Sequence, residues 1–186
     1  MVNSQAANYE AMATALSEHG LDLAQEWFEA RTGLSSADLV QALLTESGRE
    51  LGVSVATLVR RRDEIFLEQA SKVRPHAEVA AVVEAMQGVV PMAIASGGSR
   101  RVIETTLTHQ PFRDAFTALV TRDDVERGKP EPDIFVAAAH QLGATPSKCL
   151  VYEDSDEGVR AAVAAGMSVV DVRPYLSRPV SSNYSM

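Results

Sequence analysis

From Arg74 to Val172, short apolar runs alternate with segments that have helical periodicity, and this alternation limits the possible folds more than any other feature. The apolar runs are "VVPMAIA", "FTALVT", "CLVYE" and "SVVDV", and helical segments separate them. Apolar, valine-rich strands that alternate with helices are typical of a parallel sheet with helices on both faces. We therefore predict an α/β fold. In such sheets ligands bind beyond the carboxyl ends of the strands, so the residues that follow each strand are the candidate site residues.

The front of the chain has a different character, because residues 5–72 have helical patterns throughout. Four helices are expected, over residues 9–20, 23–33, 35–52 and 54–72. Short connections between helices favour a small antiparallel bundle. We therefore predict a helical domain at residues 1–72, an α/β domain at residues 73–175 and a flexible tail at residues 176–186, where proline and serine are frequent.

Composition and charge exclude several classes of protein. The 186 residues carry a formal net charge of −8, which argues against a nucleic-acid binder. The one dense basic cluster, Arg60–Arg62, is expected to form a solvated helix face, with the alternative that one of its arginines reaches an active site. No apolar stretch is long and unbroken enough to predict a membrane span. A single cysteine, Cys149, and the lack of a secretory signal favour a cytoplasmic protein.

Polar motifs follow the predicted strands. Ser96, Gly97 and Gly98 come directly after "PMAIA", and their hydroxyl and unobstructed N–H groups, next to a helix N-terminus, suit an anionic oxygen. An ordinary glycine-rich turn is the alternative for this motif on its own. Lys129 lies in "GKPEP" beside a helix start, where its charge suits a phosphate or a nearby carboxylate. A solvated loop lysine is the alternative there.

Two acids, Glu153 and Asp154, close the strand "CLVYE". Carboxylates crowded at a strand end repel one another unless a cation lies among them. Mg²⁺ suits this position, since it accepts one or two carboxylates and keeps its other positions for water and phosphate. The acids could instead favour the next helix by lying at its positive end, which is the role expected of Asp156 and Glu157. Because a hydroxyl turn and a lysine follow other strands, we predict a Mg²⁺ site at Glu153 and Asp154.

Taken in chain order, three segments resemble motifs of the haloacid dehalogenase-like hydrolase superfamily. They are "MAIASGGSR" for the second motif, "GKPEPDIF" for the third and "VYEDSDEGVRAAVAAGM" for the fourth. Within the superfamily, the chain is most similar to the β-phosphoglucomutase-like branch of sugar-phosphate phosphatases and mutases. The resemblance implies a Rossmann-like parallel sheet with flanking helices plus an inserted four-helix cap, which residues 5–72 match.

The resemblance also implies roles for the residues of the second and third motifs. Ser96 and the backbone of Gly97, with Gly98 in the same turn, would hold the phosphoryl group. Lys129 would neutralise charge on the phosphate and on the nucleophile. The peptide bond between Lys129 and Pro130 is expected to be cis, as in the family.

In the fourth motif, Glu153 and Asp154 would bind Mg²⁺, Asp154 more directly. In the cap, the loop "EARTGLSSADL" corresponds to the family's substrate-selecting loop, and Gly33 matches its glycine. Phosphoglucomutases carry an arginine in this loop where the chain has Ser36, which favours a phosphatase over a mutase.

The family's first motif, a strand followed by Asp-x-Asp-Gly-Thr, has no counterpart in the sequence. "MVNSQAANYEAM" resembles the segment that follows this motif, and the first aspartate is Asp22, within the cap. The usual first, central strand is therefore expected to be absent, together with the nucleophilic and acid–base aspartates. Its loss leaves two rows of unpaired backbone groups. We expect a truncated and inactive form of a longer protein; the alternative is a variant in which a strand of a partner chain takes this position.

The favoured function is therefore a Mg²⁺-dependent phosphatase of small phosphorylated metabolites, with sugar phosphates foremost. A non-catalytic protein that binds a phosphorylated metabolite is one alternative, and a β-phosphoglucomutase-type mutase is another. A phosphorylation-driven signalling receiver also combines acids, a hydroxyl and a Lys-Pro pair. The chain order argues against it, because receivers place the acids first and the lysine last. No nucleic-acid or membrane partner is expected, and the oligomeric state is not predicted.

Overall fold

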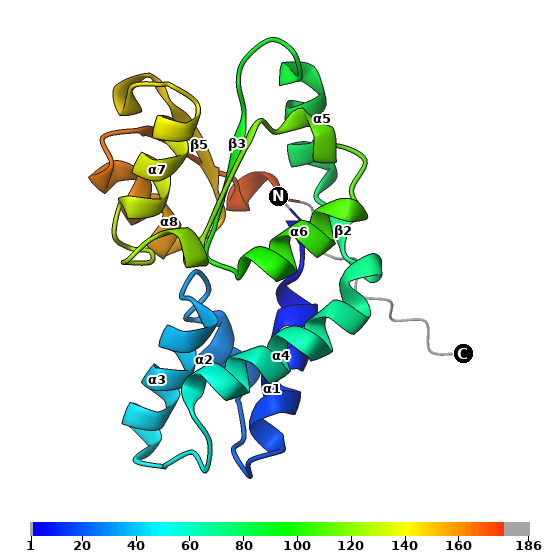
Figure 1. Cartoon of the computed structure of the whole chain (residues 1–186), viewed down its shortest axis with the longest axis vertical. Helices are drawn as coiled ribbons and strands as arrows, with labels where there is room; N and C mark the ends of the chain where they lie inside the picture. Colours follow the sequence, from blue (N-terminus) through cyan, green and yellow to red (C-terminus); the bar gives the residue numbers. More distant parts are fainter. Residues whose placement is uncertain (1, 177–186) are drawn as a thin grey trace.

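The computed structural model describes residues 2–176, which form a helical part and an α/β part (Figure 1). Most of the predicted tail, residues 177–186, lies outside the described residues. The helical part contains α1 (Gln5–Ser17), α2 (Gln25–Glu29), α3 (Ser36–Ser47), α4 (Val55–Gln69) and the short 3₁₀ helix η1 (Ala70–Lys72). Each of the four predicted helices is present. None of the helices in residues 2–176 is long and apolar enough to cross a membrane.

Local sequence signals determine where the helices of the helical part, the predicted cap, begin and end. The hydroxyl of Ser35 accepts the N–H of Asp38 at the start of α3, and Ser54 accepts the N–H of Thr57 at the start of α4. Both serines therefore satisfy N–H groups that have no partner within their own helix. Gly48 ends α3 with a φ of 64°, a left-handed conformation that glycine adopts without cost.

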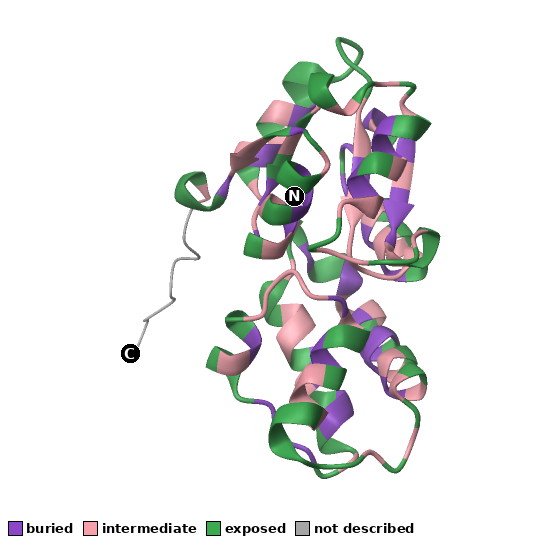
Figure 2. Ribbon diagram, turned by 90° about the vertical axis from the view of Figure 1, so that its left-hand side faces the viewer, coloured by how far each residue is buried: buried purple, intermediate pink, exposed green. Residues whose placement is uncertain are grey.

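The apolar faces of these helices form one core. Met12 and Leu16 of α1 pack with Leu58 and Phe66 of α4, and each is 2% exposed or less. Val102 of the α/β part belongs to the same cluster, so the two parts share apolar contacts. Figure 2 shows buried residues in both parts of the molecule.

The α/β part has the predicted alternation of strands and helices. Its main elements are α5 (Ala77–Met86), β3 (Ala93–Ser96), α6 (Arg100–Thr108), β4 (Ala118–Thr121), α7 (Asp133–Gln141), β5 (Leu150–Glu153), α8 (Asp156–Ala164) and β6 (Ser168–Asp171). Short 3₁₀ helices lie between them: η2 (Arg113–Ala115), η3 (Arg122–Asp124), η4 (Pro146–Lys148) and η5 (Arg173–Tyr175). β3 is shorter than the apolar run from which it was predicted. Pro91 cannot donate to a ladder, and Val89 before it is 71% exposed.

The four strands form two parallel pairs. β3 pairs with β4, where Ala93 lies opposite Ala118, and β5 pairs with β6, where Leu150 lies opposite Ser168. Within residues 2–176 no strand ladder joins the two pairs, so the strands do not form one continuous sheet. This division is the one expected if a central strand between β3 and β5 is absent.

Helices, rather than backbone pairing, hold the two strand pairs together. α7 contacts β3, β4 and α8, while α8 contacts β5 and β6. The resulting core contains Val120 of β4, Ile134 and Phe135 of α7, and Ala161 of α8. The other face of β5 lacks such a cover, since Leu150 is 53% exposed.

One ladder was not predicted. β1 (Val2–Asn3) pairs antiparallel with β2 (Arg74–Pro75), and Val2 lies opposite Pro75. The segment that enters the helical part therefore runs beside the segment that leaves it. Two-residue strands have no periodicity that could reveal them in a sequence.

Candidate functional site

Lys129 and Glu153 form a buried ion pair at the carboxyl ends of the strands. Lys129 lies between β4 and α7, Glu153 is the last residue of β5, and the distance between Nζ and Oε2 is 2.6 Å. The two side chains are 7% and 8% exposed. Nζ also lies 4.9 Å from the centroid of the Phe135 ring. Lys129 is therefore not a solvated loop lysine. The peptide bond between Lys129 and Pro130 is cis, as expected.

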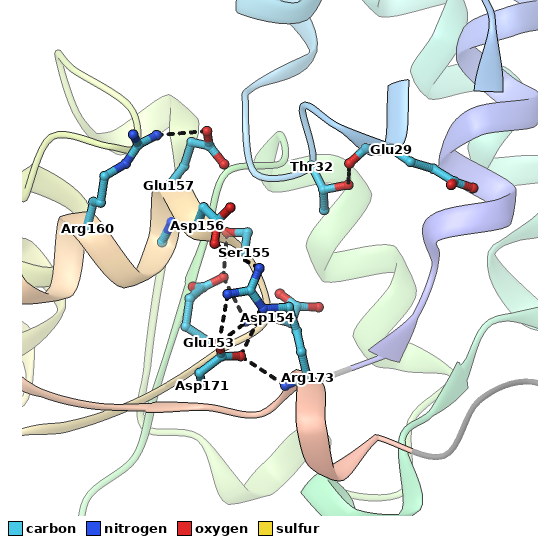
Figure 3. Close-up of polar contacts among 11 residues, drawn as sticks. Glu29, Thr32, Glu153, Asp154, Ser155, Asp156, Glu157, Arg160, Asp171 and Arg173 are labelled. Carbon is cyan, nitrogen blue, oxygen red and sulfur yellow. Dashed lines mark hydrogen bonds and ion pairs between the residues drawn. The ribbon is translucent and has the colours of Figure 1, made fainter. Parts of the chain in front are cut away.

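The second carboxylate oxygen of Glu153 has partners of its own. The hydroxyl of Ser155 donates to Oε1 over 2.9 Å, and the N–H of Asp154 donates to it over 3.1 Å. Figure 3 shows these residues gathered at the start of α8. Gly158 makes this approach possible, because a Cβ there would lie 2.0 Å from Cδ of Glu153. Glu153 is thus fixed from three sides.

Glu153 and Asp154 have pKa values shifted in opposite directions. Burial alone would raise the pKa of Glu153, but the charge and hydrogen bond of Lys129, with the hydrogen bonds from Ser155 and Asp154, hold it below its ordinary value. The pKa of Asp154 is raised, chiefly by burial and then by the neighbouring charge of Glu153. The surroundings therefore stabilise the ionised form of Glu153 and destabilise the ionised form of its neighbour Asp154.

Asp154 is the carboxylate that remains available to a cation. Across residues 2–176 it makes no ion pair, whereas Glu153 is engaged by Lys129. The same residues hold no cluster of three or more histidine, cysteine or acidic side chains that could bind a metal. A Mg²⁺ ion fits here only as a site with one carboxylate, completed by water and by phosphate oxygens, which is a common arrangement for Mg²⁺.

The turn after β3 is compact. The hydroxyl of Ser96 accepts the N–H of Gly98 over 3.3 Å. A Cβ on Gly98 would lie 3.0 Å from Cδ1 of Ile103, so a larger residue there would press on α6. Ser99 is the N-cap residue of α6, and the turn therefore leads directly into a helix N-terminus.

A loop of the helical part covers this turn and the start of α8. Gly33 has a φ of 107°, and a Cβ on it would lie 2.6 Å from Oγ of Ser155 and 3.0 Å from Oε2 of Glu157. The carbonyl oxygen of Gly33 lies 3.7 Å from where a Cβ on Gly97 would be. The loop is therefore in close contact with two of the strand ends. Figure 3 shows its neighbour Thr32, whose hydroxyl donates to the carbonyl oxygen of Glu29 over 2.8 Å.

Ser36 is the predicted site residue that these contacts do not include. It is the first residue of α3, next to the N-cap Ser35, and is half-buried. Its side chain makes no hydrogen bond with residues 2–176. No contact within residues 2–176 brings this hydroxyl to the strand ends, so its part in substrate selection stays a prediction.

Sequence reasoning missed two features beside the site. Ser155 accepts the N–H of Gly158 over 3.0 Å and so caps α8 while it also holds Glu153. Its position three residues before Gly158 was a recognisable capping signal. Arg173 lies after β6 and pairs with Asp156 over 2.8 Å and with Asp171 over 2.7 Å. No sequence signal linked Arg173 to the acids, because the pairing depends on the parallel register of β5 and β6.

The strand ends of the α/β part and the helical loop against them define an α/β protein with a helical cap over its candidate site. Over residues 2–166 the chain matches the haloacid dehalogenase-like hydrolases, and it belongs to this family. The superfamily and fold class predicted from the sequence are thereby confirmed.

Individual proteins show the same relationship. The chain is 30% identical over 173 residues to the fructose-1-phosphate phosphatase YqaB of Escherichia coli, covering 93% of this chain and 91% of that protein. The crystal structure of a hydrolase from Pseudomonas syringae is 25% identical with a TM-score of 0.83, covering 92% of this chain and 79% of that one. A β-phosphoglucomutase from Clostridium difficile shares the fold with a TM-score of 0.82 at 18% identity, over 92% of this chain and 79% of its own.

Proposed function

We propose that this protein is a Mg²⁺-dependent phosphatase of small phosphorylated metabolites, with sugar phosphates as the foremost substrates. The observation that carries the proposal is the buried Lys129–Glu153 pair beside Asp154, which makes no ion pair within residues 2–176. This arrangement places a lysine ammonium group, held by Glu153, close to a second carboxylate at the end of β5. The similarity to a protein named as a fructose-1-phosphate phosphatase supports the substrate class.

The turn after β3 supplies donors for the phosphoryl oxygens. Ser96 would donate its hydroxyl proton to the phosphate while it keeps the N–H of Gly98, and the backbone N–H group of Gly97 would bind a further oxygen near the positive end of α6. Lys129 would balance the charge of the phosphate while Glu153 keeps its ammonium group in place. Fixed donors and charges of this kind stabilise a transferring phosphoryl group without reorganisation.

Asp154 would bind Mg²⁺ directly, and Glu153 would support the site. When bound, Mg²⁺ would neutralise phosphate charge that Lys129 alone cannot balance. The raised pKa of Asp154 fits this role, because burial and the charge of Glu153 destabilise its ionised form more than the charge of Lys129 stabilises it.

The helical part would act as a cap over the substrate. Gly33 brings the loop against the strand ends, and Ser36 would face the part of the substrate away from the phosphate. Closure of such a cap excludes water during phosphoryl transfer.

The attacking carboxylate would come from a strand that pairs with both β3 and β5. Two observations support this: no ladder joins the two strand pairs in residues 2–176, and the first aspartate of the sequence is Asp22 of the helical part. Without that strand the chain would bind a phosphorylated ligand but would not cleave it. Such a binder is the second candidate function, and the same observations favour it.

The experiment adds a strand and an Asp-x-Asp-Gly-Thr segment, the first motif of the family, to the front of the chain. With Mg²⁺ and p-nitrophenyl phosphate, the extended protein should release nitrophenol, while an extension with its first aspartate replaced by asparagine should not. Lys129→Met and Asp154→Asn in the extended protein should each reduce turnover by at least about a hundredfold. A folded but inactive extended protein, tested also with fructose 1-phosphate, would contradict the proposed phosphatase.

Calorimetric titration of the chain without an extension tests the binding candidate. Fructose 1-phosphate with Mg²⁺ should give saturable heat without release of inorganic phosphate, and Asp154→Asn should weaken the response. If the folded chain gives no heat with fructose 1-phosphate or inorganic phosphate, the binding role is wrong, whatever the extended protein does.

A further inference from the structure

The middle of α4 places two charged residues in the interior. Arg62 is 5% exposed and Asp63 is 9% exposed, although Arg60 of the same cluster is exposed. The expectation of a solvated arginine face is therefore wrong for Arg62. The helical period explains this, because Arg62 lies four residues from both Leu58 and Phe66, which face the core.

The two buried charges neutralise each other. Nη1 of Arg62 donates to Oδ1 of Asp63 over 2.8 Å, and Nη2 donates to Oδ1 of Asn8 in α1. The guanidinium group also lies 5.0 Å from the centroid of the Phe66 ring. Arg62 therefore holds Asp63 in a fixed position inside the helical part.

The other oxygen of Asp63 reaches out of the helical part. The hydroxyl of Ser99 donates to Oδ2 of Asp63 over 2.6 Å. Ser99 ends the Ser96–Ser99 turn and is the N-cap of α6, so this hydrogen bond connects the cap to the end of the turn. Hydrogen bonds to a charged partner are among the stronger ones in proteins.

Ser99 does not use its hydroxyl for its own helix. A serine at an N-cap ordinarily accepts an N–H from the first turn, and Ser99 makes no such bond. The carboxylate of Asp123 accepts the N–H of Arg100 over 2.8 Å instead. Asp123 therefore satisfies a backbone N–H at the start of α6. The hydroxyl of Ser99 remains available to Asp63 in the helical part.

We propose that Asp63 is a positioning residue that couples the position of the cap against the strand ends to the geometry of the Ser96–Ser99 turn through the hydroxyl of Ser99. When the cap moves away, the hydroxyl loses Asp63 and turns to the N–H of Val102 in its own helix. Asp63 keeps its ion pair with Arg62, so opening leaves no isolated buried charge. Because the hydroxyl of Ser99 has a hydrogen-bond partner in both positions of the cap, neither position leaves it unsatisfied.

The first test measures the position of the cap in the full chain. Nitroxide labels at Ser47→Cys and Ser147→Cys, with Cys149→Ser, report the distance between cap and α/β part by electron–electron double resonance. The parent protein should give one dominant distance. Ser99→Ala should raise the population of a longer distance about fivefold, because the hydrogen bond lost to the charged Asp63 is stronger than the one lost to the N–H of Val102. Ser99→Thr retains a hydroxyl and should behave like the parent.

The second test follows the turn itself by hydrogen exchange. Asp63→Asn and Ser99→Ala should both increase exchange over residues 97–103, although Asp63 lies in the other part of the molecule. Ser54→Ala is the matched control, because it removes an N-cap hydroxyl from the same cap helix without touching the α/β part. It should leave exchange at residues 97–103 unchanged.

The proposal is overturned if folded Ser99→Ala keeps the parent's distance and its exchange at residues 97–103. Ser99→Ala leaves the Arg62–Asp63 pair intact, so its result stands even where Asp63→Asn fails to fold. Neither measurement requires catalysis, and the outcome is independent of the proposed phosphatase activity.

Discussion

At the scale of single residues, the site depends on how closely Glu153 approaches α8. Gly158→Ala would place a Cβ 2.0 Å from Cδ of Glu153, and the clash would push the carboxylate away from Lys129. We expect a loss of about 3 kcal/mol in the free energy of unfolding, the upper range for overpacking. Urea denaturation measures it. Gly52→Ala is the control, because nothing lies within 4 Å of a Cβ there; equal losses in both variants would contradict the argument.

The Lys129–Glu153 pair should make stability depend on pH. The lowered pKa of Glu153 means that the ionised group stabilises the fold above its ordinary pKa of 4.5, and that this contribution is lost as the pH falls through the folded-state value. Lys129→Met should cost about 3–5 kcal/mol at neutral pH, because it leaves a buried carboxylate unpaired. The deficit should shrink in acid, where Glu153 becomes protonated.

Thermal unfolding between pH 3 and pH 8 tests this dependence on Lys129. The exposed Lys148 provides the matched control, and Lys148→Met should follow the parent protein at every pH. A deficit of Lys129→Met that stays constant over this range would mean that the pair does not set the ionisation of Glu153.

The contribution of Asp154 to the stability of the fold should depend on pH in the opposite direction. Its raised pKa means that the ionised carboxylate destabilises the fold at neutral pH, and that the penalty disappears as the pH falls through the raised value toward the ordinary 3.8. Asp154→Asn should therefore stabilise the metal-free protein at pH 7 by on the order of 1 kcal/mol. Mg²⁺ should raise the melting temperature of the parent but not of Asp154→Asn. Equal shifts of both proteins by Mg²⁺ would place the metal elsewhere.

Residues whose position depends on one local signal could be placed from the sequence, and contacts defined by the tertiary structure could not. Ser96 is the last residue of β3, and Lys129 lies before α7 and contacts Glu153 at the end of β5. Arg62 was misjudged because a run of three arginines hides which one faces the core. The partner of Ser99 comes from a helix 36 residues away, a distance over which no sequence pattern operates.

At the scale of elements, the loop between α2 and α3 decides how the cap meets the strand ends. Gly33 combines a φ of 107° with a close approach to Ser155. Gly33→Ala should weaken binding of fructose 1-phosphate about tenfold or more in the presence of Mg²⁺, measured by calorimetry, because the added methyl group forces the loop away from Ser155. Gly20 also has a positive φ, of 70°, but an added Cβ there would have no neighbour within 4 Å, so Gly20→Ala should leave the affinity unchanged.

Periodicity and capping were sufficient to predict the helices and the four strands of the α/β part. Helix α4 was expected at residues 54–72 and runs over Val55–Gln69, because its serine N-cap and apolar positions are local signals. The β1–β2 ladder was missed, since its pairing depends on the cap bringing two distant segments together. Helices and strands could therefore be predicted where their own residues provide the periodicity or the capping signal.

At the scale of the whole molecule, the two strand pairs are joined by helix packing alone within residues 2–176. Among these residues, β3 pairs only with β4, and β5 pairs only with β6. Each of the two strands therefore has one edge that forms no ladder within this range. The gap is expected from the resemblance, because the sequence has no counterpart of the family's first strand. The sequence did not indicate that α7 would bridge the gap through contacts with β3, β4 and α8. Such packing depends on three-dimensional shape and leaves no pattern along the chain.

The gap has a consequence for cooperativity that can be measured. Backbone groups on an unpaired edge exchange with solvent, and a core divided between two strand pairs opens in smaller units. Hydrogen exchange of the chain should therefore be faster over residues 150–153 and 168–171 than over α1 and α4. The extended protein, which adds a strand for both edges, should slow exchange in β3 and β5 together and raise the melting temperature. If the extension slows exchange in only one of these strands, the added strand does not lie between them, and the attacking carboxylate must be sought at another edge.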